Sequence, residues 1–187
     1  MNELQKAILD GNFEVDGGRV LVPSQRLTIG GVFEGEIVRN GEVIDRFEDH
    51  NLVVNEGLNH LLDVVLHGST QVTTWYLGLF EGNYTPVAAV TAATITSAAT
   101  ETTAYDEATR REFTEAAASS QSITNSASRA TFTFNATKTL YGAFLVSASA
   151  KSATTGTLFS AARFASTKNV DSGDELLLTY TFSAASA

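Results

Sequence analysis

Hydrophobic and polar residues alternate with a period of two along most of the chain, which is the pattern of β-strands with one buried face. The strands we predict cover residues 19–22, 27–39, 42–50, 73–80, 122–124, 129–135, 139–150, 156–165 and 175–182. Asn40-Gly41 lies between the second and third of these, and this dipeptide favours a type I′ hairpin turn. Short strands without intervening helices predict a mainly β fold, an antiparallel β-sandwich or jelly roll.

One stretch, residues 51–68, has helical periodicity instead. Its apolar residues recur at spacings of three and four, at Leu58, Leu61, Leu62, Val65 and Leu66. Asn55 is placed to cap the start of a helix, and Gly68 to end it in a left-handed conformation. We therefore predict one packed α-helix over about residues 55–66, inserted between the sheet strands.

The faces of this helix lead to specific expectations. The residues expected to cover one side of the sandwich are Leu58, Leu61, Leu62 and Val65, while Asn59 and Asp63 should face outwards. Leu62→Asp should then destabilise the fold, because it would bury a charge without a partner.

The domain organisation follows from the same pattern. Residues 1–18 are expected to form an N-terminal arm, because a short helical pattern at Leu4, Ile8 and Leu9 breaks at Asp10-Gly11. Residues 19–187 are expected to form a single β-rich domain. Within it, residues 81–103 have no clear period and predict a long loop. Residues 104–113 fit a strand slightly better than a helical turn.

Composition narrows the classes of partner. The net charge is −9, and the acidity belongs to residues 1–115, which hold 7 Lys/Arg and 18 Asp/Glu. Such a chain, with no basic cluster, is not expected to bind nucleic acid. Cysteine is absent, and no apolar run is long enough for a membrane span, so we expect no membrane partner. The Ala, Thr and Ser of the second part favour burial against neighbouring subunits.

The histidines and carboxylates are the candidate residues for catalysis or metal binding. His60 and His67 are seven residues apart, too far to ligate one zinc ion together. His50 does not complete a metal-binding motif with either of them. Two carboxylate pairs, Glu34 with Glu36 and Asp106 with Glu107, could in principle carry out glycoside hydrolysis, which uses two carboxylates. The first pair shares one strand face and is better interpreted as solvated surface residues. The serines lie in Ala/Ser/Thr-rich stretches without a nucleophile motif. We therefore expect no enzyme, no catalytic or metal-binding residues and no cofactor.

Two further groups have competing interpretations. Asp171 and Asp174 flank a Gly-Asp turn, and turn chemistry fits them better than calcium binding, because the calcium-loop spacing is absent. Four aromatic residues could form a carbohydrate platform, but their apolar neighbours favour core packing: Trp75, Tyr76, Phe80 and Tyr84.

Several segments together resemble a known group of proteins. They are NLVVNEGLNHLLD at 51–63, WYLGLFEGNYTP at 75–86, TAYDEATRREF at 103–113 and SRATFTFNATKTLYGAFLVSAS at 128–149, followed by GTLFSAARF and GDELLLTYTF. This order, over residues 45–183, resembles small structural proteins of tailed bacteriophages.

The resemblance implies a non-enzymatic virion component, made in the bacterial host cytoplasm. The implied role is a capsid decoration or cement protein, a homo-oligomer that binds neighbouring subunits of the major capsid protein. The same motifs fit the alternative of a tail or head fibre module that binds a receptor or glycan. In the first role, the acidic N-terminal part or the 81–103 loop is expected to reach the shell.

Overall fold

The structure is a computed structural model that describes residues 14–16, 19–21 and 27–186. The chain divides into two compact units, residues Met1–Thr28 with Ala184–Ala187, and Ile29–Ser183. In the first unit, β1 (Glu14–Asp16) pairs antiparallel with β2 (Arg19–Leu21). Most of the arm expected at 1–18, residues 1–13 and 17–18, lies outside the described residues.

One sheet of the larger unit is built on the predicted hairpin. β3 (Leu27–Arg39) pairs antiparallel with β4 (Glu42–His50), and both bounds agree with the prediction. Asn40 and Gly41 have φ values of 52° and 84°, as a type I′ turn requires. The strand order is β4-β3-β12-β8, and β9 also pairs with β12. These strands are β8 (Ser122–Thr124), β9 (Ala130–Thr133) and β12 (Glu175–Ser186).

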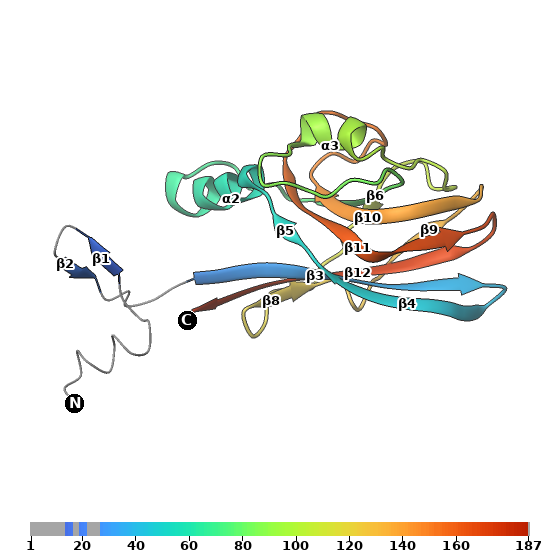
Figure 1. Ribbon diagram of the computed structural model, residues 1–187, viewed down its shortest axis with the longest axis horizontal. Helices are drawn as coiled ribbons and strands as arrows, with labels where there is room; N and C mark the ends of the chain where they lie inside the picture. The colour runs from blue at the N-terminus through green and yellow to red at the C-terminus, as the bar shows by residue number, and fades with distance from the viewer. Residues whose placement is uncertain (1–13, 17–18, 22–26, 187) are drawn as a thin grey trace. The chain divides into compact units, whose positions relative to one another are not determined.

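The second sheet has the order β5-β11-β10-β6-β7 and faces the first across the core (Figure 1). Its strands are β5 (Leu52–Val53), β6 (Tyr76–Phe80), β7 (Arg111–Glu112), β10 (Lys138–Val146) and β11 (Leu158–Val170). All the pairings are antiparallel. The predicted β-sandwich is confirmed, while this strand order does not identify a jelly roll.

Asn51 fixes the corner at which the chain passes from the first sheet to the second. Its Oδ1 accepts from the Gly31 amide at 2.6 Å, and its Nδ2 donates to the Tyr180 hydroxyl at 2.8 Å. Beside it, the Asp49 carboxylate accepts from the amide of Ala165 on β11 at 2.7 Å, and burial raises the pKa of that carboxyl. Side chains therefore join β4 to β11 where no ladder connects them.

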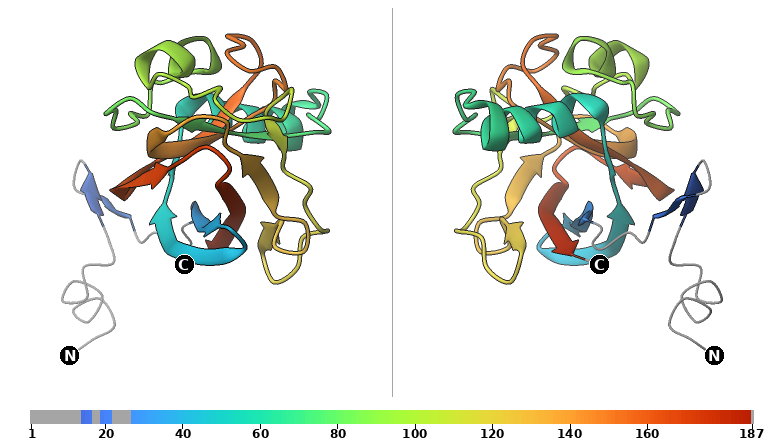
Figure 2. Two further views of the ribbon diagram at one scale, coloured as in Figure 1. Left: turned by 90° about the vertical axis from the view of Figure 1, so that its right-hand side faces the viewer. Right: turned by 90° about the vertical axis from the view of Figure 1, so that its left-hand side faces the viewer.

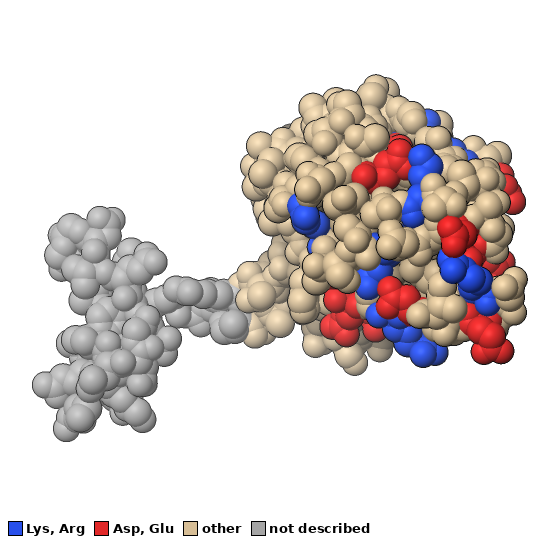
Figure 3. Space-filling view, turned by 45° about the vertical axis from the view of Figure 1, so that its right-hand side comes forward, with Lys and Arg blue, Asp and Glu red and all other residues tan. Residues whose placement is uncertain are grey.

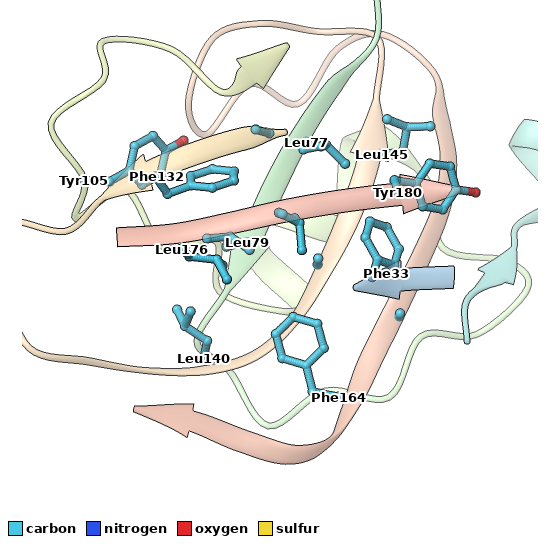
Figure 4. Packing of buried hydrophobic residues seen from close by; sticks show 14 of the residues in the cluster. Phe33, Leu77, Leu79, Tyr105, Phe132, Leu140, Leu145, Phe164, Leu176 and Tyr180 are labelled. Carbon is cyan, nitrogen blue, oxygen red and sulfur yellow. The ribbon is translucent and has the colours of Figure 1, made fainter. Parts of the chain in front are cut away.

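The main core lies between the sheets, and its side chains point toward one another in Figure 4. The predicted alternation is confirmed on two strands, because the inward positions are buried: Ala130, Phe132, Leu176, Leu178 and Tyr180. A second cluster lies on the outer face of the β6–β10–β11 sheet and includes Phe80, Ile95 and Phe144. The second sheet is therefore apolar on both faces.

What covers that outer face differs from the prediction. Residues 81–103 are not a structureless loop, because they contain α3 (Ala92–Ala98), which lies over the sheet (Figures 1 and 2). A reciprocal capping box between Thr91 and Thr94 starts this helix. Small residues surround Ile95, so the segment has too few large apolar side chains to display a helical period. Of residues 104–113, only β7 is a strand.

The predicted helix is present and has a different start and end. α2 covers Asn55–Leu62, and a π-helical turn, Asp63–His67, continues it. Val54 occupies the N-cap position, so the expectation that Asn55 caps the helix is wrong: Asn55 is the first helical residue, and no side chain caps this end. The Asn55 amide donates to the Ala88 carbonyl at 2.8 Å. Gly68, with a φ of 73°, ends the helical segment as predicted.

Candidate interaction surfaces

The start of α2 is fixed to the sandwich by two residues. The Glu56 carboxylate accepts from the backbone amides of Ala92, at the start of α3, and Leu158, at the start of β11, both at 2.8 Å. Gly57 is buried, and a Cβ there would overlap the carbonyl oxygen of Phe159. The backbone of α2 therefore lies directly on β11, in a position that only glycine permits.

The end of the same helical segment is exposed. Leu62, Val65 and Leu66 are 56%, 68% and 79% exposed, so the expectation that Leu62 and Val65 cover the sandwich is wrong. Leu58 and Leu61 are half-buried, and Asn59 and Asp63 face outwards as predicted. The cause is the close contact at Gly57, because it holds the first turn on β11. Within the described residues, the π-helical turn has no comparable contact with any strand.

A hollow of about 190 Å³ lies beside this exposed end. Its wall combines helix residues with aromatic residues of the sandwich, including His60, Leu61, Val64, Trp75, Phe159 and Phe182. The rings form a connected row, because Trp75 lies edge-on to both His60 and Phe159 at 5.5 Å. Glu115 is the one charged residue among the described residues of the wall. We call Leu62, Val65 and Leu66 the α2 patch; with the hollow, it forms an apolar end of the sandwich.

The surface over α3 has a different character. Residues 82–100 contain no Lys, Arg, Asp or Glu, and their exposed side chains are aliphatic or small and uncharged: Asn83, Thr85, Val87, Ala88, Ala89, Ala93, Thr94, Ser97, Ala98 and Thr100. We call this the α3 face. Exposed protein surfaces usually carry about one charged residue in four. In Figure 3 most charged side chains lie on the lower and right-hand parts of the molecule, and the upper left part is uncharged.

Charges concentrate instead on the β3–β4 hairpin. A polar hollow of about 770 Å³ lies there, lined by Glu34, Glu48, Arg46 and Arg129, among others. Glu36 accepts from Arg46 at 2.8 Å and Arg129 at 2.7 Å, and these bonds lower the pKa of its carboxyl. Glu36 therefore makes structural ion pairs, and Glu34 is exposed, as expected of solvated surface residues.

The second candidate carboxylate pair also makes structural contacts. Glu107 accepts from the amide and hydroxyl of Thr133, and Asp106 accepts from Asn135 Nδ2 at 3.2 Å. Both carboxylates therefore connect the 104–110 segment to β9 and the residues that follow it.

Asp171 and Asp174 form the predicted turn. Asp174 Oδ2 accepts from the Asp171 amide at 2.8 Å, and Arg39 donates to both Asp174 carboxylate oxygens at 2.8 and 2.6 Å. The guanidinium lowers the pKa of the Asp174 carboxyl. The predicted turn is therefore present, and Arg39 pairs with its carboxylates.

The three histidines are not brought together as a metal site. His60 lies against Trp75, and His67 Nδ1 lies 3.4 Å from Asp63 Oδ1 on the exposed helix end. His50 is exposed at the end of β4. Among residues 27–186, no group of three His, Cys, Asp or Glu side chains is placed to hold a metal ion.

Core packing is the better interpretation of the aromatic residues considered for a carbohydrate platform. Phe80 is completely buried, and Trp75 and Tyr84 are half-buried against the two core clusters. Tyr76 is half-buried on β6.

A buried ion pair was not predicted from the sequence. Arg110 is 1% exposed and donates through Nε and Nη2 to the two oxygens of Glu101, at 2.8 and 2.7 Å. Its Nη1 donates to the Ala148 carbonyl, and the Ser152 amide donates to Glu101. The pair therefore joins the segment after α3 to the 147–153 loop. Nothing in the sequence around Arg110 distinguishes it from its neighbour Arg111, which is only half-buried.

No protein-family model matches this sequence, and no curated protein matches it either. Among the helices of the described residues, none is both long enough and apolar enough to span a membrane.

Proposed function

We propose that the protein is a non-enzymatic structural component of a tailed-phage virion, which decorates the capsid by binding neighbouring subunits of the major capsid protein. The observation that carries this proposal is the α3 face, which presents no charge over residues 82–100. An uncharged, small-residue surface loses little solvation free energy when another protein covers it. It is suited to contact area rather than to chemistry.

The support beneath the α3 face favours the same role. Ile95 and Ala99 are buried in the second core cluster, and the capping box fixes the start of α3. The Arg110–Glu101 pair holds the chain that follows. A surface whose backbone is already fixed loses little conformational entropy on binding, which favours affinity.

The test compares virus particles assembled with and without the protein. We expect a high and fixed copy number on the head, and particles lacking the protein should lose their genome at a lower temperature. Location in the tail by electron microscopy, together with unchanged heat resistance, would contradict the decoration role.

A second candidate function, glycan or receptor binding on a fibre, is favoured by the polar hollow on the β3–β4 hairpin. Sugar hydroxyls pair well with carboxylates and guanidinium groups such as Glu48 and Arg46. Binding of the purified protein to host cells or to a glycan panel, lost on Arg46→Ala, would favour this candidate. Absence of such binding, with the protein on the head, would remove it.

A further inference from the structure

The α2 patch needs a partner that the α3 face does not provide. Leu62, Val65 and Leu66 are all more than half exposed and lie within five residues of one another. Apolar side chains gathered in this way typically mark a protein-binding site. From the charges around the patch we propose that its partner is a second copy of this chain, packed helix against helix about a two-fold axis.

Asp63 and His67 are placed to face each other across a two-fold axis. They lie two residues on either side of Val65, and their side chains are 53% and 83% exposed. If two antiparallel copies of the helix cross at Val65, Asp63 of each copy faces His67 of the other, because a two-fold contact is reciprocal. Within one copy the two side chains are 3.4 Å apart, so aspartate acceptors and imidazole nitrogens alternate around the axis.

The rim of the patch fits the same partner. Residues 69–74 follow the helix and contain no charged side chain, and most of them are exposed. A stable dimer buries roughly 800 Å² on each partner, more than three aliphatic side chains provide. The uncharged 69–74 segment supplies additional area without burying a charge. This inference rests on the proposed function, because it names the contact that would make the virion protein a homo-oligomer.

Sedimentation of the full chain over a range of concentrations tests the inference. The parent should form dimers, Leu66→Asp should be monomeric, and Asp63→Lys should weaken association about tenfold or more by removing the carboxylate that faces His67 of the other copy. The exchange Asp63→Lys/His67→Glu restores opposite charges across the axis and should restore dimers. Glu175→Lys makes the same change in charge on an exposed residue of β12 and should associate like the parent.

Three results would overturn the inference: a parent that stays monomeric at every concentration, dimers that persist in Leu66→Asp, or an exchange variant no better than Asp63→Lys. All changed positions are exposed, and an unchanged circular dichroism spectrum confirms folding. A monomeric parent found on virus heads would defeat this inference alone. A dimer absent from particles would defeat the proposed function alone.

Discussion

The two α-helices of the described residues, α2 and α3, use their apolar residues in opposite ways. α2 and its π-helical turn carry the large aliphatic residues, yet Leu62, Val65 and Leu66 face solvent. α3 is made of Ala, Thr, Ser and one isoleucine, and that Ile95 is 1% exposed. An amphipathic pattern therefore indicates that a face will be covered, but does not say whether the cover is the same chain. Substitutions in α2 and α3 distinguish these two outcomes.

The largest effect is expected at Ile95. Ile95→Asp places a charge in the second core cluster without a partner, so we expect a loss of about 4 kcal/mol in the free energy of unfolding, measured with urea. Ala93→Asp, on the exposed side of the same helix, is the matched control and should change stability by less than about 0.5 kcal/mol. Equal effects at the two positions would mean that α3 does not cover the sheet.

Arg110 gives the next effect. Arg110→Met leaves the Glu101 carboxylate buried without its cation, and we expect about 3 kcal/mol of destabilisation. Arg110→Met/Glu101→Gln removes the charge that was left unpaired and should recover part of the loss. A double variant as unstable as the sum of the two single variants would show that the two side chains do not interact.

Glu56 tests the connection between the helices. Glu56→Ala leaves the buried amides of Ala92 and Leu158 without an acceptor, so we expect a loss of about 2 kcal/mol. Glu56→Gln keeps one acceptor oxygen and should lose less. Thermal unfolding of the parent and both variants measures these losses. If both variants melt at the same temperature as the parent, the two hydrogen bonds do not contribute to stability.

The smallest effect is expected at Leu62, where the sequence alone predicted a large one. Because Leu62 is 56% exposed, Leu62→Asp should change the free energy of unfolding by about 0.5 kcal/mol or less. The measurement requires protein concentrations at which the parent is monomeric, since association would add its own stability. A loss comparable to that of Ile95→Asp would show instead that Leu62 packs on the sandwich, as the sequence predicted.

Much of the fold could be predicted from the sequence because its signals are local. Asn40-Gly41 specifies its turn through φ alone, and alternation assigns β3, β4 and the inward faces of β9 and β12. α3 escaped prediction because Ala, Thr and Ser have no apolar period. The Arg110–Glu101 pair escaped it because the burial of a charge depends on the distant 147–153 loop.

The candidate surfaces were only partly visible. The sequence indicated burial against other subunits for the Ala-, Thr- and Ser-rich part after residue 115, whereas the uncharged stretch at 82–100, on one helix and its flanks, lies in the acidic first part of the chain. The exposure of the α2 patch could not be read from periodicity, because it follows from the contact of Gly57 with Phe159, a residue 102 positions away.

The most direct test of the account is binding of purified protein to virus particles that lack it. Ala93→Glu/Ser97→Glu places two charges on the α3 face, and Ser166→Glu/Ser172→Glu places the same charges on exposed positions of β11 and the turn that follows. We predict that the parent and the second variant bind heads to the same saturating copy number, while the first variant remains folded and fails to bind. Equal binding of both variants would contradict the claim that the α3 face meets the capsid.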